Sequence, residues 1–161
     1  MNGSCSWIRL CIQFRHGRYL QFFGVMIMGA GYFVSVEGVE GVGKSTIIQF
    51  IQSLFVEFGV DFINTREPGG TPLAEDIRQL LLDKHEEMIQ QSTELLLMFA
   101  ARAQNVNHII MPALSAGKVV LADRFTDATY AYQGAGRGLS QATIDHLVTL
   151  VHPNIKPDLT L

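Results

Sequence analysis

The sequence is poor in cysteine and holds only two, Cys5 and Cys11, both near its beginning. Two cysteines do not make the framework of a disulfide-stabilised domain, and they lack the paired spacing of a structural zinc site. The cysteines therefore do not indicate a redox compartment.

Basic residues are not in excess either, because the formal net charge is −3. Proteins that bind nucleic acid without sequence preference usually carry a basic surface, so no nucleic-acid partner is expected. Acidic residues are absent before Glu37, although Arg9, Arg15 and Arg18 lie there. That bias would fit a targeting peptide. We favour instead an N-terminal extension at 1–31, whose first part, to about residue 26 or 28, comes from an upstream start or a dispensable tail.

Long apolar runs are also missing. The uncharged stretch from Phe22 to Val36 is too short for a membrane helix, which needs about 20 apolar residues, and Gly24, Gly29 and Gly31 interrupt it. No membrane partner is therefore expected. The length of 161 residues suggests one domain, and a hydrophobic fraction of 48% suffices for a packed core.

From Tyr32 onward, short apolar segments alternate with amphipathic ones. The expected strands are YFVSV at 32–36, VDFIN at 60–64, KVVLAD at 118–123 and PDLTL from 157. Helices are expected at 45–58, 72 to about 83, 92 to about 116, 127–133 and 140–151, with Thr71 and Ser140 as N-caps, Pro112 interrupting the longest helix, and a flexible loop at 134–138. This alternation predicts an α/β fold with a doubly wound parallel sheet and helices on both faces.

The segment GVEGVGKS at 38–45 fits the pattern G-x-x-x-x-G-K-[ST] of a P-loop, between a strand and a helix. Its glycines let backbone N–H groups point at phosphate oxygens, beside the positive end of the helix. Lys44 would reach the β- and γ-phosphates and the Ser45 hydroxyl would bind Mg²⁺. This context favours a nucleotide-binding loop over an ordinary turn. The residues expected to bind ATP are Gly38, Val39, Glu40, Gly41, Val42, Gly43, Lys44, Ser45 and Thr46.

Two charged residues stand in unusual surroundings. Glu40 would repel phosphate from within the loop, so it faces either a hydroxyl of a second substrate or solvent. Arg102 lies in the apolar stripe of a helix. An unpaired buried guanidinium is very costly, so Arg102 needs a carboxylate partner or a ligand, and both remain open.

Charged residues also follow the strands. Asp123 ends an apolar strand, where ligands bind in doubly wound sheets, and it could support Mg²⁺ through water. Its neighbour Arg124 could reach a phosphate, although an Asp-Arg pair can simply begin a loop. Arg66 follows the second strand in the same way. Convergence of Arg66, Arg102 and Arg124 would give more positive charge than ATP requires, which suggests a second phosphate-bearing substrate.

The segments that surround these residues are similar to those of bacterial thymidylate kinases, in order and spacing, from about Tyr32 to Leu161. They read FVSVEGVEGVGKST, TREPGGTPLAEDIRQLLLD, ELLLMFAARAQ, DRFTDATYAYQGAGRG and PDLTL. The resemblance implies a cytoplasmic, usually homodimeric P-loop kinase that uses ATP and Mg²⁺ to convert dTMP to dTDP for dTTP and DNA synthesis. Alternatives are another nucleoside monophosphate kinase, against which TREPGG argues, and a catalytically impaired nucleotide-binding fragment.

The resemblance also implies roles for single residues. Lys44, Asp123 and Arg124 would be catalytic, with Ser45 and Asp123 near Mg²⁺. Glu40 would contact the deoxyribose 3′-hydroxyl, and Arg66 and Arg124 would hold the dTMP phosphate. Arg102 would read the thymine base. The segment with Thr129, Tyr132 and Gln133 would line the nucleoside pocket.

Three positions qualify the resemblance. Met98 stands where the family usually stacks a phenylalanine on thymine, with Phe99 next to it, and its thioether could cover the ring. Ala128 replaces a usual serine. Gly41 is typical of the subgroup that supplies its catalytic arginine from a later lid, which is expected beyond Leu161 with a last strand and helix. The domain at 32–161 is therefore expected to be incomplete, with little kinase activity.

Overall fold

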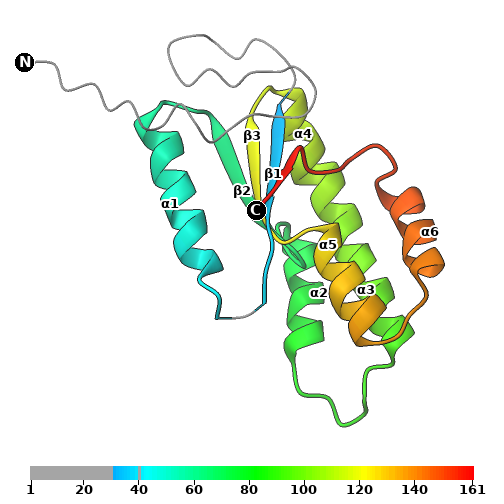
Figure 1. Ribbon diagram of the computed structural model, residues 1–161. Helices are drawn as coiled ribbons and strands as arrows, with labels where there is room; N and C mark the ends of the chain where they lie inside the picture. The colour runs from blue at the N-terminus through cyan, green and yellow to red at the C-terminus, as the bar shows by residue number, and fades with distance from the viewer. Residues whose placement is uncertain (1–30, 40) are drawn as a thin grey trace, which may run out of the picture.

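The computed structural model describes residues 31–39 and 41–161 (Figure 1). The predicted extension and the roles predicted for Glu40 fall on residues outside these ranges, apart from Gly31. Within the described ranges, no helix has both the length and the apolar character needed to cross a bilayer.

The described strands form one parallel sheet with the order β2-β3-β1-β4. In this sheet Val36 and Arg66 both lie beside Asp123 on the central strand. The strands are β1 (Tyr32–Val36), β2 (Phe62–Arg66), β3 (Val119–Asp123) and β4 (Leu159–Thr160). The predicted parallel α/β sheet is confirmed, and the predicted strands match within two residues at each end.

Helices cover both faces of the sheet (Figure 1). Helix α1 lies on one face and the remaining helices lie on the other. Their bounds are α1 (Lys44–Glu57), α2 (Pro72–Leu82), α3 (Gln91–Asn105), α4 (Met111–Ser115), α5 (Thr126–Thr129) and α6 (Gln141–Val151), with π-helical turns η2 (Val106–Ile110) and η3 (Tyr130–Gly136).

The strand β1 shows why the sheet is covered twice. Phe33 packs into a cluster with Val106 and Ile110 of η2, while Val34 packs with Phe55 of α1. Successive side chains of a strand point to opposite faces. An apolar residue at both positions therefore requires cover on both sides.

The predicted N-caps are confirmed at two helices. The Thr71 hydroxyl accepts a hydrogen bond from the Ala74 N–H at 3.2 Å, with Pro72 as the first residue of α2. The Ser140 hydroxyl accepts one from the Thr143 N–H, also at 3.2 Å. Each cap satisfies an N–H that has no partner within its own helix.

The long helix is interrupted as predicted, and its regular part ends at Asn105. The wider turn η2 follows, and Pro112 lies in the first turn of α4. Proline has no N–H and its ring crowds the carbonyl four residues earlier. A widened π-helical turn just before it relieves that conflict.

The prediction of a flexible loop at 134–138 was wrong, because η3 continues to Gly136. Two side chains tie this turn to neighbouring helices: Tyr130 donates to Asp145 at 2.5 Å and Gln133 donates to Glu94 at 2.8 Å. Glycine disfavours helix by about 1 kcal/mol. Tertiary contacts overcome that local preference here.

Candidate active site

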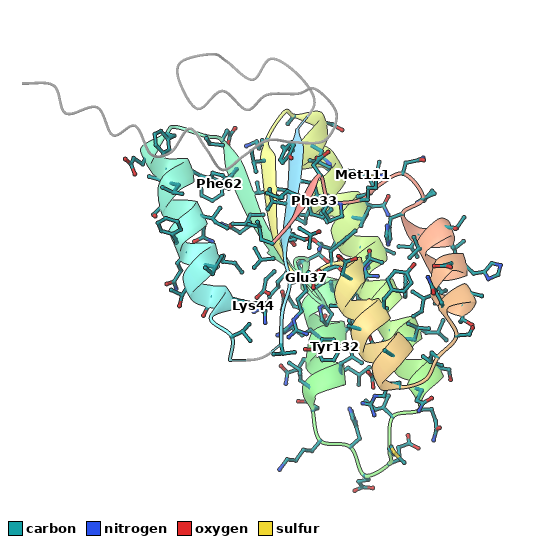
Figure 2. The ribbon with its side chains drawn as sticks, viewed as in Figure 1. Phe33, Glu37, Lys44, Phe62, Met111 and Tyr132 are labelled. Atoms are coloured by element: carbon teal, nitrogen blue, oxygen red, sulfur yellow. The ribbon has the colours of Figure 1, made fainter. Side chains whose placement is uncertain are left out.

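The carboxyl ends of three strands bring the predicted charges together. The Glu67 N–H donates to the Asp123 carbonyl and the Arg124 N–H donates to the Val36 carbonyl, each at 3.0 Å. Arg66, Asp123 and Arg124 therefore meet at one edge of the sheet. Figure 2 shows Glu37 and Lys44 at this same end.

The glycine loop has the conformation that its sequence predicts. Gly38, Gly41 and Gly43 have φ values of 138°, 81° and 91°, which side chains other than hydrogen disfavour. Gly43 caps α1 without a side-chain hydrogen bond, and the first turn of α1 holds no acidic residue. The positive end of α1 is thus left for an anion.

Lys44 lies across this loop. Its Nζ donates to the carbonyl oxygens of Gly38 at 3.0 Å and of Val39 at 3.2 Å. The amine is therefore held at the mouth of the loop by neutral acceptors. A phosphate oxygen is a stronger partner for an ammonium group than a backbone carbonyl.

Glu37 follows β1 directly and reaches the turn after β3. Its Oε1 accepts a hydrogen bond from the Phe125 N–H at 2.7 Å. Burial raises the pKa of Glu37, and the Phe125 N–H acts in the opposite direction. This bond fixes the backbone beside Arg124.

Arg66 is exposed but oriented. Its Nε and Nη2 donate to the two carboxylate oxygens of Glu75, at 3.1 and 2.6 Å. The Gly70 N–H also donates to Glu75, at 2.9 Å. Hydrogen bonds from Arg66 and Gly70 lower the pKa of Glu75. Two parallel bonds fix the plane of the guanidinium.

Arg102 has the carboxylate partner that its apolar surroundings demand. Its Nε donates to Glu67 Oε2 at 2.6 Å, and both side chains are nearly inaccessible, at 1% and 2%. Its Nη2 donates to the Thr129 hydroxyl at 2.9 Å. Burial raises the pKa of Glu67, and the charge of Arg102 opposes that rise.

The hydrogen bonds to Glu67 and Thr129 use Nε and Nη2 of Arg102 but not Nη1. Its Nη1 is buried and has no hydrogen-bond partner among the described residues. Phe99 and Phe125 lie against the guanidinium, with ring centres 4.7 and 5.2 Å from its central carbon. Phe99 is itself buried against Leu95 and Ile144, whereas Met98 is only half-buried. Of the two, Met98 is therefore the side chain free to meet a ligand.

Asp123 and Arg124 form the turn after β3. Arg124 has a φ of 72°, which is uncommon outside glycine and tends to occur at functional sites. Its guanidinium lies 5.0 Å above the Tyr132 ring. Asp123 Oδ1 is buried and has no hydrogen-bond partner among the described residues. This turn thus offers a cation and an unused carboxylate oxygen.

A comparison with models of protein families agrees with this arrangement of charged residues after the strands. The family model described as thymidylate kinase matches residues 36–161, which includes every element from the glycine loop to β4. The chain belongs to the thymidylate kinase family. The resemblance seen in the sequence is thereby confirmed.

Curated members of the thymidylate kinase family are similar over most of this chain. The thymidylate kinase of Teredinibacter turnerae is 58% identical over 131 residues, which are 81% of this chain and 64% of the relative. That of Hahella chejuensis is 57% identical over 134 residues, with 83% and 64% covered. This chain thus spans slightly less than two thirds of the length of these relatives.

A solved member of the family has the same fold. The crystal structure of thymidylate kinase from Ehrlichia chaffeensis superimposes with a TM-score of 0.75 at 39% sequence identity. The match covers 82% of this chain and 75% of that one. The P-loop α/β architecture predicted from the sequence is therefore supported by fold as well as by motif.

Sequence reasoning missed four acids of this region, of which Glu67 pairs with Arg102 and Glu75 with Arg66. Glu37 and Glu67 directly follow strands, so the argument used for Asp123 could have found them. Glu75 and Glu94 lie inside helices with nothing distinctive around them, and only their contacts identify them.

One hollow of the described part lies elsewhere. It measures about 430 Å³ and runs beside β2, η2 and α4, with Ile63, His108, Pro112 and Lys118 in its lining. None of the predicted site residues lines it. The candidate active site is therefore placed at the strand ends and not at this hollow.

Proposed function

We propose that this chain carries the machinery of a kinase that transfers the γ-phosphate of ATP to dTMP and gives dTDP. The supporting observation is that the loop with Lys44 and the strand-end residues Arg66, Asp123 and Arg124 meet at one edge of the sheet, in a chain of the thymidylate kinase family.

The donor binds at residues 38–46. Backbone N–H groups of the loop and of the first turn of α1 face the ATP phosphates. Lys44 exchanges its two carbonyl acceptors for β- and γ-phosphate oxygens. Its charge then lies where negative charge develops during transfer.

Magnesium fits the residues at this edge. The described residues include no group of three His, Cys, Asp or Glu side chains that could hold an ion alone. Mg²⁺ commonly keeps waters and takes only one or two protein ligands plus phosphate oxygens. The Ser45 hydroxyl and the unused Asp123 Oδ1 would supply these. When bound, the ion neutralises charge on the phosphates.

The acceptor dTMP binds along the same edge. Arg66 and Arg124 hold its phosphate, and Arg102 donates from Nη1 to a carbonyl oxygen of the base. Met98, Thr129, Tyr132 and Gln133 surround the nucleoside, and Glu40 contacts its 3′-hydroxyl. The deeply buried Arg102, with one nitrogen that has no hydrogen-bond partner in the described part of the chain, supports this assignment.

The chain contributes by positioning and charge, without a covalent intermediate. The two substrates are aligned, and the arginines and Lys44 stabilise the transferring phosphoryl group. We further propose that the enzyme acts in the cytoplasm as a homodimer and feeds dTTP synthesis, with no nucleic-acid or membrane partner.

The test measures binding and transfer separately. Titration calorimetry should show binding of ATP with Mg²⁺ and of dTMP, and a product assay should detect dTDP. Failure to bind either nucleotide contradicts the proposal. Binding of both without detectable dTDP supports the alternative of an impaired nucleotide-binding fragment.

A further inference from the structure

Glu94 connects α3 to η3 and to Arg137, the residue that follows η3, by two hydrogen bonds. Its Oε1 accepts from Gln133 Nε2 at 2.8 Å, and its Oε2 accepts from Arg137 Nη2 at 3.0 Å. Gln133 is 5% exposed, and its Oε1 is buried without a hydrogen-bond partner among the described residues. One end of this amide is therefore held and the other end is unused.

The held end decides which way the amide faces. An ionised carboxylate offers only hydrogen-bond acceptors, whereas an amide offers an NH₂ donor at one end and a carbonyl acceptor at the other. The NH₂ of Gln133 must face Glu94, because the opposite orientation would place two oxygens together. Gln133 Oε1 is consequently turned away from Glu94 as an acceptor.

A second connection lies eight residues, or about two turns, further along α3 and joins it to the end of α5. Arg102 of α3 donates to Thr129, four residues before Gln133. Met98 stands four residues from both Glu94 and Arg102 on α3, and residues four apart share a helix face. Met98 thus lies between the two connections, with the acceptor Gln133 Oε1 at one and the donor Arg102 Nη1 at the other.

The two unused atoms suit one kind of base. A buried polar atom without a partner costs about 1–3 kcal/mol, so both atoms point to a ligand that completes them. A donor and an acceptor on the two sides of Met98 match the carbonyl and the neighbouring ring N–H of thymine and uracil. Cytosine offers an amino group and a bare ring nitrogen, so it would place donor against donor and acceptor against acceptor.

We propose that Glu94 is a positioning residue that fixes the Gln133 amide with its carbonyl toward the base, and so selects imide bases over cytosine. The inference rests on the proposed function, since it takes this pocket to hold the base of dTMP. Glu94 acts through Gln133 and does not itself touch the nucleotide.

The test compares the affinities of Glu94 variants for dTMP and dCMP. Glu94→Met removes the acceptor at similar size, leaves the amide free to turn, and should lower the preference for dTMP over dCMP about tenfold. Glu94→Gln still offers an amide oxygen to Gln133 and should keep most of the preference. Arg137→Ala removes only the other partner of Glu94 and is the matched control, expected within about twofold of wild type.

A second substitution makes the test independent of how well Glu94→Met folds. Glu94→Lys presents a donor that attracts Gln133 Oε1, so the preference should fall further than in Glu94→Met. ATP affinity, measured on each variant, should stay unchanged, whereas a purely structural defect would weaken both nucleotides.

The outcomes separate the two proposals. Unchanged preference in a folded Glu94→Met or Glu94→Lys chain, with dTMP still bound, overturns the role of Glu94 and leaves the proposed function standing. A wild-type chain that binds ATP but shows no binding of dTMP overturns both.

Discussion

The two halves of the proposed site differ in how far they are assembled without nucleotide. The phosphate side comprises residues 38–46, Arg66 and Arg124, and there Lys44 and Arg124 are half-buried, while Arg66 is 53% exposed and shares an exposed ion pair with Glu75. The base side comprises Glu67, Glu94, Arg102, Thr129 and Gln133, and there Arg102 is 1% exposed and already paired. The interactions of the phosphate side are completed only when the ligand phosphates bind, whereas the side-chain pairs of the base side form during folding.

This difference has a physical reason. Phosphates arrive with several negative charges, so exposed cations can remain hydrated until they are needed. A base is neutral and must be recognised by a few directed hydrogen bonds, which need buried groups of fixed orientation. Substitutions on the phosphate side should therefore affect turnover, and those on the base side should also affect stability.

The largest effect is expected from Lys44→Ala on the phosphate side. Loss of an ammonium aimed at the transferring group should lower dTDP formation by at least about 100-fold. The free energy of unfolding should change by less than about 1 kcal/mol, because the hydrogen bonds of Lys44 to described residues go to two backbone carbonyls of an exposed loop. Steady-state kinetics at saturating ATP and urea unfolding measure both. Near-normal turnover would contradict the role of this loop.

On the base side, Arg102→Ala should lower both stability and dTMP affinity. It leaves Glu67 buried without its partner, which typically costs about 3–5 kcal/mol. Calorimetry should show weaker dTMP binding and unchanged ATP binding. The double substitution Glu67→Gln with Arg102→Met should recover part of the stability, because no buried charge is left unpaired. Lower stability with unchanged dTMP affinity would make the pair purely structural.

A smaller effect, dependent on pH, is expected at His152 behind the base side. His152 packs on Phe99 and Phe125, which flank Arg102, with ring centres 6.4 and 5.0 Å away. Burial chiefly, together with the charge of Arg102, lowers the pKa of His152 below its ordinary 6.5. As pH falls below 6.5, the unfolded chain takes up a proton that the folded chain resists, so stability falls.

Comparison with His152→Phe isolates this contribution from those of the carboxyl groups. Relative to the variant, wild type should lose at most about 1.4 kcal/mol of unfolding free energy per pH unit below 6.5. Urea unfolding of both chains at about pH 7.5 and about pH 5 measures the difference. Parallel pH profiles would show that His152 does not titrate as its surroundings indicate.

The smallest effect is expected from Glu75→Gln on the phosphate side. The pair of Arg66 and Glu75 is exposed, at 53% and 37%, and such pairs contribute less than about 1 kcal/mol. Its buried counterpart is Glu67→Gln, which should cost several times more. Equal losses of unfolding free energy in the two variants would remove the contrast between the two sides.

The sequence alone determined the local elements and the family. Strand and helix positions follow from hydrophobic periodicity, which neighbouring residues set. Thr71 and Ser140 cap helices because of their own hydroxyl groups, and the glycine loop requires backbone angles that only glycine accepts easily. The motifs around these elements also pointed to the thymidylate kinase family, which the family match bears out.

The tertiary structure alone decided how those elements are connected. Arg102 needed a carboxylate, but only the fold identified Glu67, 35 residues away, and only the fold placed Glu94 beside Gln133, 39 residues away. The sequence did not predict the helical turn at Gly134 to Gly136 for the same reason, since contacts with distant segments hold it. Periodicity and backbone preference act within a few residues, whereas ion pairs and amide orientations depend on which distant segments the sheet brings together.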